Sequence, residues 1–331
     1  MNEYIGIDVS KASLQCYIPA ENEDIEIDNS KGGLSKLNRR LQRCRKQGKE
    51  PILIFEPTGG YSVALKKFCA SRAIQCFIVN PRQSANFLKA LGERNKTDKV
   101  DARMLSQMHV LAGKGEIAVP VIDVLAEQIK ERMGYYKLIQ KQRVTMQNHL
   151  EAAKAKQSDA FIIKRLEKEV KRLKQEEQAL IDSLLELIRE NPSMQRKFES
   201  ITSFKGIGPL AGLALLHLFL SYPDANRKQI TALCGLDVVV AESGTSLRRK
   251  GRISKKGSKL YRGTLFMATM ISIQHNPKMR AFYERLKENG KHSTAAQIAV
   301  MRKMILIAHS LFKNESIYDL DHQRYRCSDL S

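Results

Sequence analysis

The order of β-rich and helical segments near the N-terminus most restricts the fold of this chain. Three short β-rich segments come first, separated by Glu, Asn and Asp turn residues, at 4–9, 14–18 and 25–27. Helical patterns then alternate with apolar runs that suit buried strands, in the order 34–44, 51–56, 61–70 and 76–79. An antiparallel meander followed by alternating helices and strands predicts an α/β layered domain with a mixed sheet.

The charge of the chain indicates a polyanionic partner. The 331 residues include 56 Lys and Arg against 35 Asp and Glu, for a net charge of +21. A soluble fold does not require this excess, and nucleic acid is the first partner that it indicates, ahead of an anionic membrane surface. A hydrophobic content of 43% fits a folded protein of two domains or one large one. No apolar run approaches the ~20 residues of a membrane span, and we expect no charged-then-apolar leader before the first strand.

The cysteines and histidines indicate neither a disulfide framework nor a zinc site. The 6 cysteines lack C-x-x-C spacing, and several lie within apolar patterns, which fits reduced thiols in a cytoplasm. The 7 histidines form no H-E-x-x-H or comparable cluster, and His217, on an apolar helix, is expected in the core.

Four carboxylates lie where an α/β fold would gather them. We expect Asp8 at or near the middle of the first strand and Glu56 at the carboxyl end of the fourth, where sites form in open α/β sheets. Asp98 and Asp101 are three apart, on the first turn of a helix expected at 99–112. If that helix crosses the strand ends, the four acids share a pocket and require divalent cations to neutralise them.

Two metal ions ~4 Å apart, each polarising one side of a phosphodiester, are the standard use of such a cluster. Single acids have simpler interpretations. Thr97 or Asp98 can cap a helix whose first turn favours anions, and Glu56 can be a surface acid before a Pro-Thr-Gly-Gly turn.

The middle of the chain predicts a long helical hairpin or coiled coil. Apolar residues follow a 4-3 spacing over 125–150 and again over 166–187, with Arg132, Arg143 and Glu177 as polar interruptions. We expect this segment to serve as a spacer and to support self-association. The alternative is an intramolecular hairpin packed on the next domain.

A mostly helical domain is expected to follow from Met194. Its Gly206-Ile207-Gly208 turn resembles that of helix-hairpin-helix modules, whose backbone amides face a DNA phosphate, although a plain tight turn is the alternative. Residues 247–259 are basic at seven of thirteen positions, with glycines that let the backbone approach a phosphate; a solvated loop is the alternative. Three closing helices are expected at 261–272, 278–289 and 294–313.

Taken in order, these motifs resemble one family. The N-terminal motifs are similar to those of DEDD-type transposases of bacterial insertion sequences: Tyr4-Ile5-Gly6-Ile7-Asp8, Glu56-Pro57-Thr58-Gly59 and Asn95-Lys96-Thr97-Asp98 with Asp101-Ala102-Arg103. Three later motifs resemble those of the second domain of that family: Gly206-Ile207-Gly208, Cys234-Gly235-Leu236 and Glu242-Ser243-Gly244, the last followed by basic residues. More specifically, the chain resembles the branch that acts as a bridge-RNA-guided DNA recombinase.

The resemblance implies an architecture and a set of site residues. It implies an α/β RuvC-like (ribonuclease H fold) domain at 1–118, a helical coiled coil at 119–192, a mostly helical transposase domain at 193–320 and a tail at 321–331. Asp8, Glu56, Asp98 and Asp101 would bind one or two Mg²⁺, and Ser243 would attack a DNA phosphate to give a covalent intermediate. Nucleic acid would contact the basic residues Lys96, Arg103, Lys205, Arg248, Arg249, Lys250, Arg252, Lys255, Lys256 and Lys259.

The implied partners are donor DNA, target DNA and a guide RNA, with dimers that pair into tetramers in a bacterial or archaeal cytoplasm. A serine hydroxyl needs an activating base or metal, and no histidine lies near Ser243 in sequence. We therefore expect both domains to contribute to one site, within a chain or between chains. From the residues alone Ser246, Ser254 and Ser258 share the same basic neighbourhood.

Four other functions remain to be weighed. A non-guided RuvC-like nuclease or a Holliday-junction resolvase would use the same acids. A non-catalytic nucleic-acid-binding scaffold would use them only as caps and turn residues. An actin-like or sugar-kinase-like ATPase shares the Gly-Ile-Asp strand, but the chain has no second glycine-rich phosphate loop and its charge of +21 would be unexplained.

Overall fold

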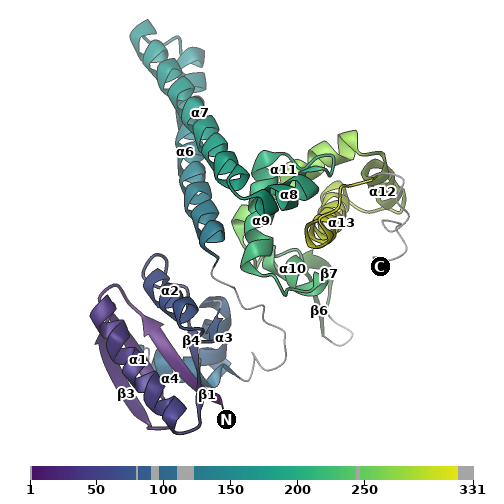
Figure 1. The fold of residues 1–331 in the computed structure, drawn as a ribbon. Coiled ribbons are helices and arrows are strands. Elements are labelled where there is room, and N and C mark those ends of the chain that lie inside the picture. Colours follow the sequence, from purple (N-terminus) through teal and green to yellow (C-terminus); the bar gives the residue numbers. More distant parts are fainter. Residues whose placement is uncertain (1, 80, 91–96, 110–122, 244–246, 320–331) are drawn as a thin grey trace. The chain divides into compact units, whose positions relative to one another are not determined.

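The structure is a computed structural model that describes residues 2–79, 81–90, 97–109, 123–243 and 247–319. It divides into two compact units, residues 1–122 and 123–331 (Figure 1).

The first unit is built on a five-stranded mixed sheet. In sheet order β3-β2-β1-β4-β5, the strands are Glu23–Asp28, Ser13–Ile18, Asn2–Val9, Glu50–Phe55 and Cys76–Ile78. The first three strands pair antiparallel, and β4 and β5 run parallel to β1. The predicted meander and mixed sheet are confirmed. The apolar run at β4 is buried on both faces, as expected of a central strand.

Helices cover both faces of this sheet. On one face, α1 (Lys31–Lys46) and α2 (Val63–Ser71) bury leucines such as Leu37, Leu41 and Leu65 against the strands. On the other face, Met104, Leu105 and Met108 from α4 (Asp98–Gln107) and its C-cap pack against the sheet, close to α3 (Pro81–Ala90). A mixed sheet in this order with helices on both faces is a ribonuclease H-like arrangement.

The second unit begins with a helical hairpin, α6 (Val124–Ala155) and α7 (Ala160–Arg189) (Figure 1). Its polar interruptions are paired across the hairpin: Arg143 donates to Glu177 at 2.7 Å, and Arg132 donates to the Ser183 carbonyl at 2.7 Å. The apolar seam is thus filled within one chain, and the base of the hairpin packs on the next helices. The hairpin is therefore the intramolecular alternative, and self-association stays a prediction.

Helices and one small sheet complete the second unit. The helices are α8 (Pro192–Thr202), α9 (Pro209–Ser221), α10 (Arg227–Leu233), α11 (Lys259–His275), α12 (Pro277–Glu288) and α13 (Ser293–Asn314). By length and composition α13 is the one described helix that could cross a membrane, but 61% of its most apolar window is buried inside the unit. It packs against α8, α11 and α12, as a core helix does.

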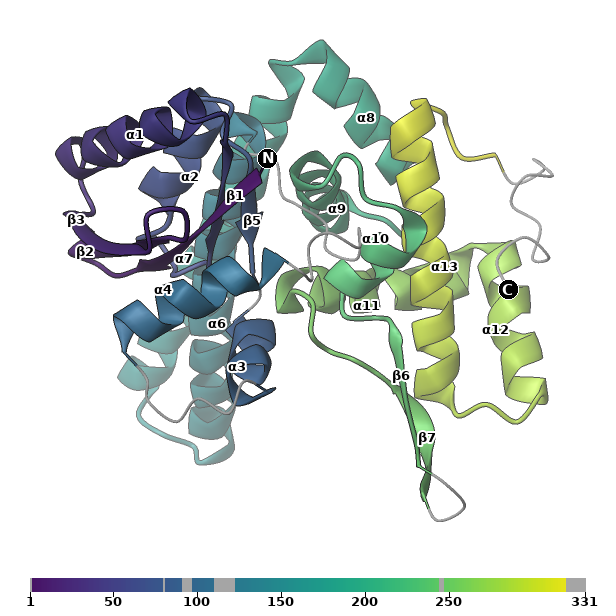
Figure 2. The ribbon, with the colours of Figure 1, turned by 90° about the horizontal axis from the view of Figure 1, so that it is seen from below.

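The first part of the basic stretch, residues 247–253, is a strand that the sequence analysis did not predict. Strands β6 (Val238–Ser243) and β7 (Leu247–Ile253) form an antiparallel hairpin that extends away from the helices of this unit (Figure 2). Strand β7 was not predicted because its arginines and lysine interrupt the alternation of apolar and polar residues by which strands are recognised.

Candidate metal-dependent active site

Two of the four predicted acids lie at the carboxyl ends of neighbouring parallel strands. Asp8 is the penultimate residue of β1, so its expected place near the middle of the strand was wrong. Glu56 directly follows β4. The register pairs Ile7 with Phe55, which puts Asp8 and Glu56 at matching positions on one edge of the sheet.

The pleat directs Asp8 toward α4. Side chains alternate between the faces of a strand, and Ile5, Ile7 and Val9 belong to the core on the α1 and α2 face. Tyr4 packs into the α4 core on the other face, so Gly6 and Asp8 share that side.

Helix α4 brings the other two acids to the same place. Thr97 caps the helix, with its hydroxyl accepting from the Val100 amide at 3.3 Å, so Asp98 and Asp101 lie on the first turn. The helix crosses β1 in backbone contact at Gly6: a Cβ on that glycine would be 1.9 Å from the Ala102 carbonyl oxygen. Only glycine permits this approach, because any side chain would push the helix off the strand.

Three of the acids act electrostatically on the fourth, Asp8. Burial is the largest cause that raises the pKa of Asp8, followed by the negative charges of Asp98, Asp101 and Glu56, and together they bring it to about 6. A carboxylate responds in this way to acids that lie nearby. Strand ends and helix start thus gather the four residues that were predicted to lie together.

The donor set suits a hard divalent cation. Carboxylate oxygens are the ligands that Mg²⁺ prefers, and several of them in one place repel one another unless a cation is shared. Within the described residues, no three His, Cys, Asp or Glu side chains already converge at ligand distance. The four acids as the structure describes them therefore do not form a closed coordination shell.

Ser243 lies at the outer end of the β6–β7 hairpin, as the last residue of β6, paired with Leu247. The base of this hairpin is fixed by a close backbone contact. A Cβ on Gly257 would be 2.2 Å from both the Gly235 amide nitrogen and the Leu233 carbonyl oxygen. Arg262 donates to the carbonyls of Cys234 and Gly257, at 3.3 Å each. The two ends of the hairpin are thus held together on α10 and α11.

The predicted nucleic-acid contacts fall into three groups. Lys205, Arg252, Lys255, Lys256 and Lys259 are exposed, and none of these five makes an ion pair with another described residue. Arg103 is instead held by Asp24 of β3 and lies over the Tyr17 ring, so its charge is already matched. Lys96 and the side chains of Arg248, Arg249 and Lys250 lie outside the described residues.

The predicted turn at Gly206 packs against the protein. Gly206 has φ +111°, and a Cβ there would be 2.6 Å from the Cβ of Ser272 in α11. Lys205 and Gly208, on either side of this contact, are exposed. The turn is therefore a packing contact at Gly206 and an open surface at its flanks.

Comparison with known proteins identifies the family. Residues 5–154 match the family model of DEDD transposases of the IS110 type, and residues 199–284 match the model described as "Transposase IS116/IS110/IS902 family". The chain belongs to this transposase family. The transposase is accordingly an enzyme that cuts and rejoins DNA, and its DEDD domain implies a divalent metal site.

Similar proteins include two invertases. The pilin gene-inverting proteins of Moraxella bovis and Moraxella lacunata are each 26% identical over 326 residues, covering 96% of this chain and 97% of theirs. A 42 kDa uncharacterized protein of insertion element IS900 from Mycobacterium paratuberculosis is 26% identical over 163 residues, covering 48% of this chain and 39% of that one.

Two positioning features were missed by the sequence interpretation. Gly6, inside a strand pattern, is itself a signal of close backbone approach. The contact between Gly235 and Gly257 joins two segments 22 residues apart, and no local pattern in either segment indicates the other.

Proposed function

We propose that this transposase is a Mg²⁺-dependent, serine-nucleophile DNA recombinase that a bridge RNA guides to its DNA sites. Its first unit is RuvC-like in this proposal. The proposal is supported above all by the burial of Asp8 at the strand end and by the electrostatic influence of Glu56, Asp98 and Asp101 on it. Acids gathered in this way on a ribonuclease H-like sheet suit phosphodiester chemistry better than a structural role.

The proposed reaction begins when the Ser243 hydroxyl oxygen attacks a backbone phosphorus. A bond from phosphorus to serine forms, the bond from phosphorus to the 3′ oxygen breaks, and the 3′ hydroxyl leaves carrying a proton. The serine proton passes to a nearby base, for which the acid cluster is the candidate because no histidine is close in sequence. Attack of another DNA 3′ hydroxyl on the phosphoserine reverses these steps and rejoins the strand.

Bound Mg²⁺ would neutralise the charge that develops on the phosphate oxygens. The chain's own residues have separate parts in this scheme. Asp8 and Glu56, on the sheet edge, would provide fixed ligands, whereas Asp98 and Asp101 move with α4. Ser243 would be presented by a hairpin whose base is fixed at Gly235 and Gly257.

The serine assignment is tested with a nicked DNA substrate that traps the covalent intermediate. Ser243→Ala should abolish the protein–DNA adduct seen on a denaturing gel, while Ser246→Ala, a matched control in the same segment, should retain it. An adduct that persists in Ser243→Ala would show that another group is the nucleophile.

The metal assignment is tested separately by strand cleavage at saturating Mg²⁺. Asp8→Asn should lose cleavage and keep DNA binding, because it removes a ligand and not a DNA-binding residue. Asp28→Asn removes the same charge from an exposed position of the same sheet and should cleave normally. Normal cleavage by Asp8→Asn would favour the non-catalytic scaffold.

The guide is tested by what copurifies. A defined small RNA bound to the purified transposase, required for recombination and exchangeable for one of altered sequence, would support guidance. Recombination by RNA-free protein would instead favour direct reading of DNA, as in an unguided nuclease or resolvase. The relatives named as pilin gene-inverting proteins support site-specific inversion as one outcome of the same chemistry in this chain.

A further inference from the structure

The charge of the α6–α7 hairpin is divided along its length. The outer part, residues 141–174, carries ten Lys and Arg against four Asp and Glu. The inner part, residues 124–140 and 175–190, carries four against seven. A solvated helical face normally mixes both signs, so this division calls for a partner at the outer part.

Three of the seven acids of the inner part form ion pairs within the hairpin. Glu127 pairs with Lys130 at 3.3 Å. Glu176 accepts from Arg172 at 2.8 Å and from the Tyr135 hydroxyl at 2.7 Å, and Glu177 pairs with Arg143 at 2.7 Å. These three acids therefore offer little to the basic end of a second copy.

The outer lysines of α7 lack such partners. Lys164, Lys168 and Lys171 are spaced four and three residues apart, which places them on one face of the helix. All three are exposed, and none pairs with a carboxylate among the residues that the structure describes. At 1.5 Å rise per residue the three span about 10 Å, the length of two or three nucleotides along one strand.

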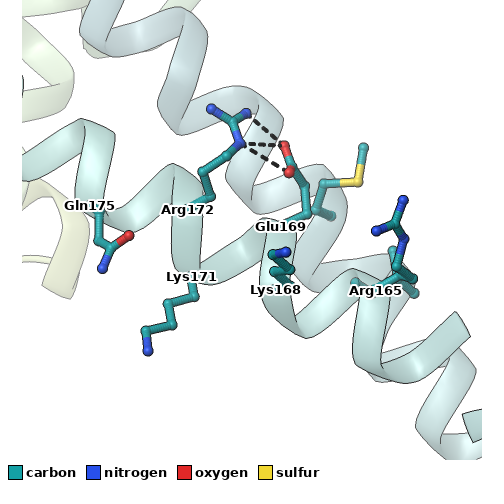
Figure 3. Close-up of a pocket in the computed structure, with 8 residues that line it drawn as sticks. Arg165, Lys168, Glu169, Lys171, Arg172 and Gln175 are labelled. Atoms are coloured by element: carbon teal, nitrogen blue, oxygen red, sulfur yellow. Dashed lines mark hydrogen bonds and ion pairs between the residues drawn. The ribbon is translucent and has the colours of Figure 1, made fainter. Parts of the chain in front are cut away.

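Two of these lysines, Lys168 and Lys171, border a groove between the two helices. The groove has a volume of about 680 Å³ and is lined by Met146, Arg165, Leu166, Lys168, Glu169, Lys171, Arg172 and Gln175. Figure 3 shows the charged side chains that project from α7, and dashed lines mark the ion pair between the guanidinium of Arg172 and the carboxylate of Glu169. Because Glu169 is taken by Arg172, it does not cancel the neighbouring lysines.

We infer that this face of α7 is a docking surface for the sugar–phosphate backbone of duplex DNA. The chain belongs to a family that cuts and rejoins DNA, and such an enzyme must hold duplex beyond the bonds that it cuts. Lysine ammonium groups bind phosphates as point charges without reading sequence, and each contact releases condensed counterions. The surface therefore holds flanking DNA, independently of the nucleophile and of the metal site.

The test is the salt dependence of binding to a long duplex of unrelated sequence, which needs no cleavage. The triple variant Lys164→Gln, Lys168→Gln and Lys171→Gln should bind more weakly at low salt. The slope of log K against log salt should fall in magnitude by about 2.7, since each lost phosphate contact removes about 0.9. Glutamine and lysine have similar helix propensity, so the exposed helix should fold as before.

The matched control removes the same charge elsewhere in the second unit, with Lys278→Gln, Lys287→Gln and Lys291→Gln. Its slope should change by less than one contact, about 0.9. Equal changes of the slope in both triple variants would mean that DNA binding depends only on the net charge of the protein. That result would refute the proposed docking surface. A loss confined to duplex RNA of the same length would overturn the assignment to DNA. The triple variant could instead show a changed oligomeric state, measured by light scattering, and an unchanged salt slope of DNA binding. That result would assign the lysines to contacts between copies of the chain and refute the DNA surface.

Discussion

Replacing Gly6 with alanine should displace α4 and with it half of the acid cluster. The added Cβ would lie 1.9 Å from the Ala102 carbonyl oxygen and 2.6 Å from the Ser106 amide nitrogen. Since carbon and oxygen rest at about 3.3–3.6 Å, the helix must retreat by roughly 1.5 Å. Backbone atoms cannot rotate out of the way as a side-chain end can, so the shift is carried by the whole helix start.

That shift is large for a metal site and moderate for the fold. Ligand distances in metal sites tolerate about 0.2 Å, so moving Asp98 and Asp101 by roughly 1.5 Å should disrupt shared coordination with Asp8 and Glu56. Misplacement of about 1 Å costs on the order of 10²-fold in rate. Overpacking of this kind lowers the free energy of unfolding by about 1–3 kcal/mol, which most domains survive.

The assay combines Mg²⁺-dependent strand cleavage with chemical unfolding of the same preparation. Gly6→Ala should cleave about 10²-fold more slowly while remaining folded by circular dichroism. Gly32→Ala in α1 is the control, because its nearest atom is the Ser30 hydroxyl oxygen at 3.7 Å, an ordinary contact. Wild-type cleavage by a folded Gly6→Ala variant would refute the argument that this strand–helix contact sets the site.

Two further predictions concern the second unit. His217 is buried, its Nδ1 lies 2.6 Å from the Tyr261 hydroxyl, and burial is the main cause that lowers its pKa from 6.5 to about 4. The pKa of His217 is lower in the folded protein than in the unfolded one. Neutral His217 therefore contributes fully to the free energy of unfolding above about pH 6.5, and this contribution is lost as the pH falls toward 4. Urea unfolding should show a loss of about 3 kcal/mol from this group, absent in His217→Gln and present in the surface variant His149→Gln. Gly257→Ala should push the hairpin base off Gly235 and lower the yield of covalent DNA adduct at least tenfold while DNA binding persists. Gly263→Ala, whose Cβ would meet nothing within 4 Å, should leave the adduct unchanged. An unchanged adduct in both variants would show that the contact between Gly235 and Gly257 is not needed for adduct formation.

Prediction from sequence worked best where a local pattern of residues identifies a helix or strand. The strands at 51–56 and 76–79 were readable because buried parallel strands are apolar throughout, and α4 was readable from Thr97 and its helical spacing. Prediction failed where charge hides periodicity, as in β7, and where a polar interruption is satisfied by a distant residue. Arg143 and Glu177 each interrupt the apolar spacing of their own helix, but they form a partly buried ion pair although 34 residues separate them in sequence.

The candidate site depends on a long-range backbone contact between β1 and α4, and Gly6 was the only sequence signal of that contact. The acids could be grouped from sequence because strand ends and helix starts are common sites, but the contact that sets their spacing is made by backbone atoms. A residue without a side chain leaves no chemical signature of such a role. The same holds for Gly257, where two backbones meet at the base of the hairpin that carries Ser243. In both units a glycine contact therefore fixes an element that carries proposed site residues, α4 in the first unit and the β6–β7 hairpin in the second. Catalytic geometry in this transposase should accordingly be more sensitive to an added methyl group at Gly6 or Gly257 than to the loss of most exposed charges.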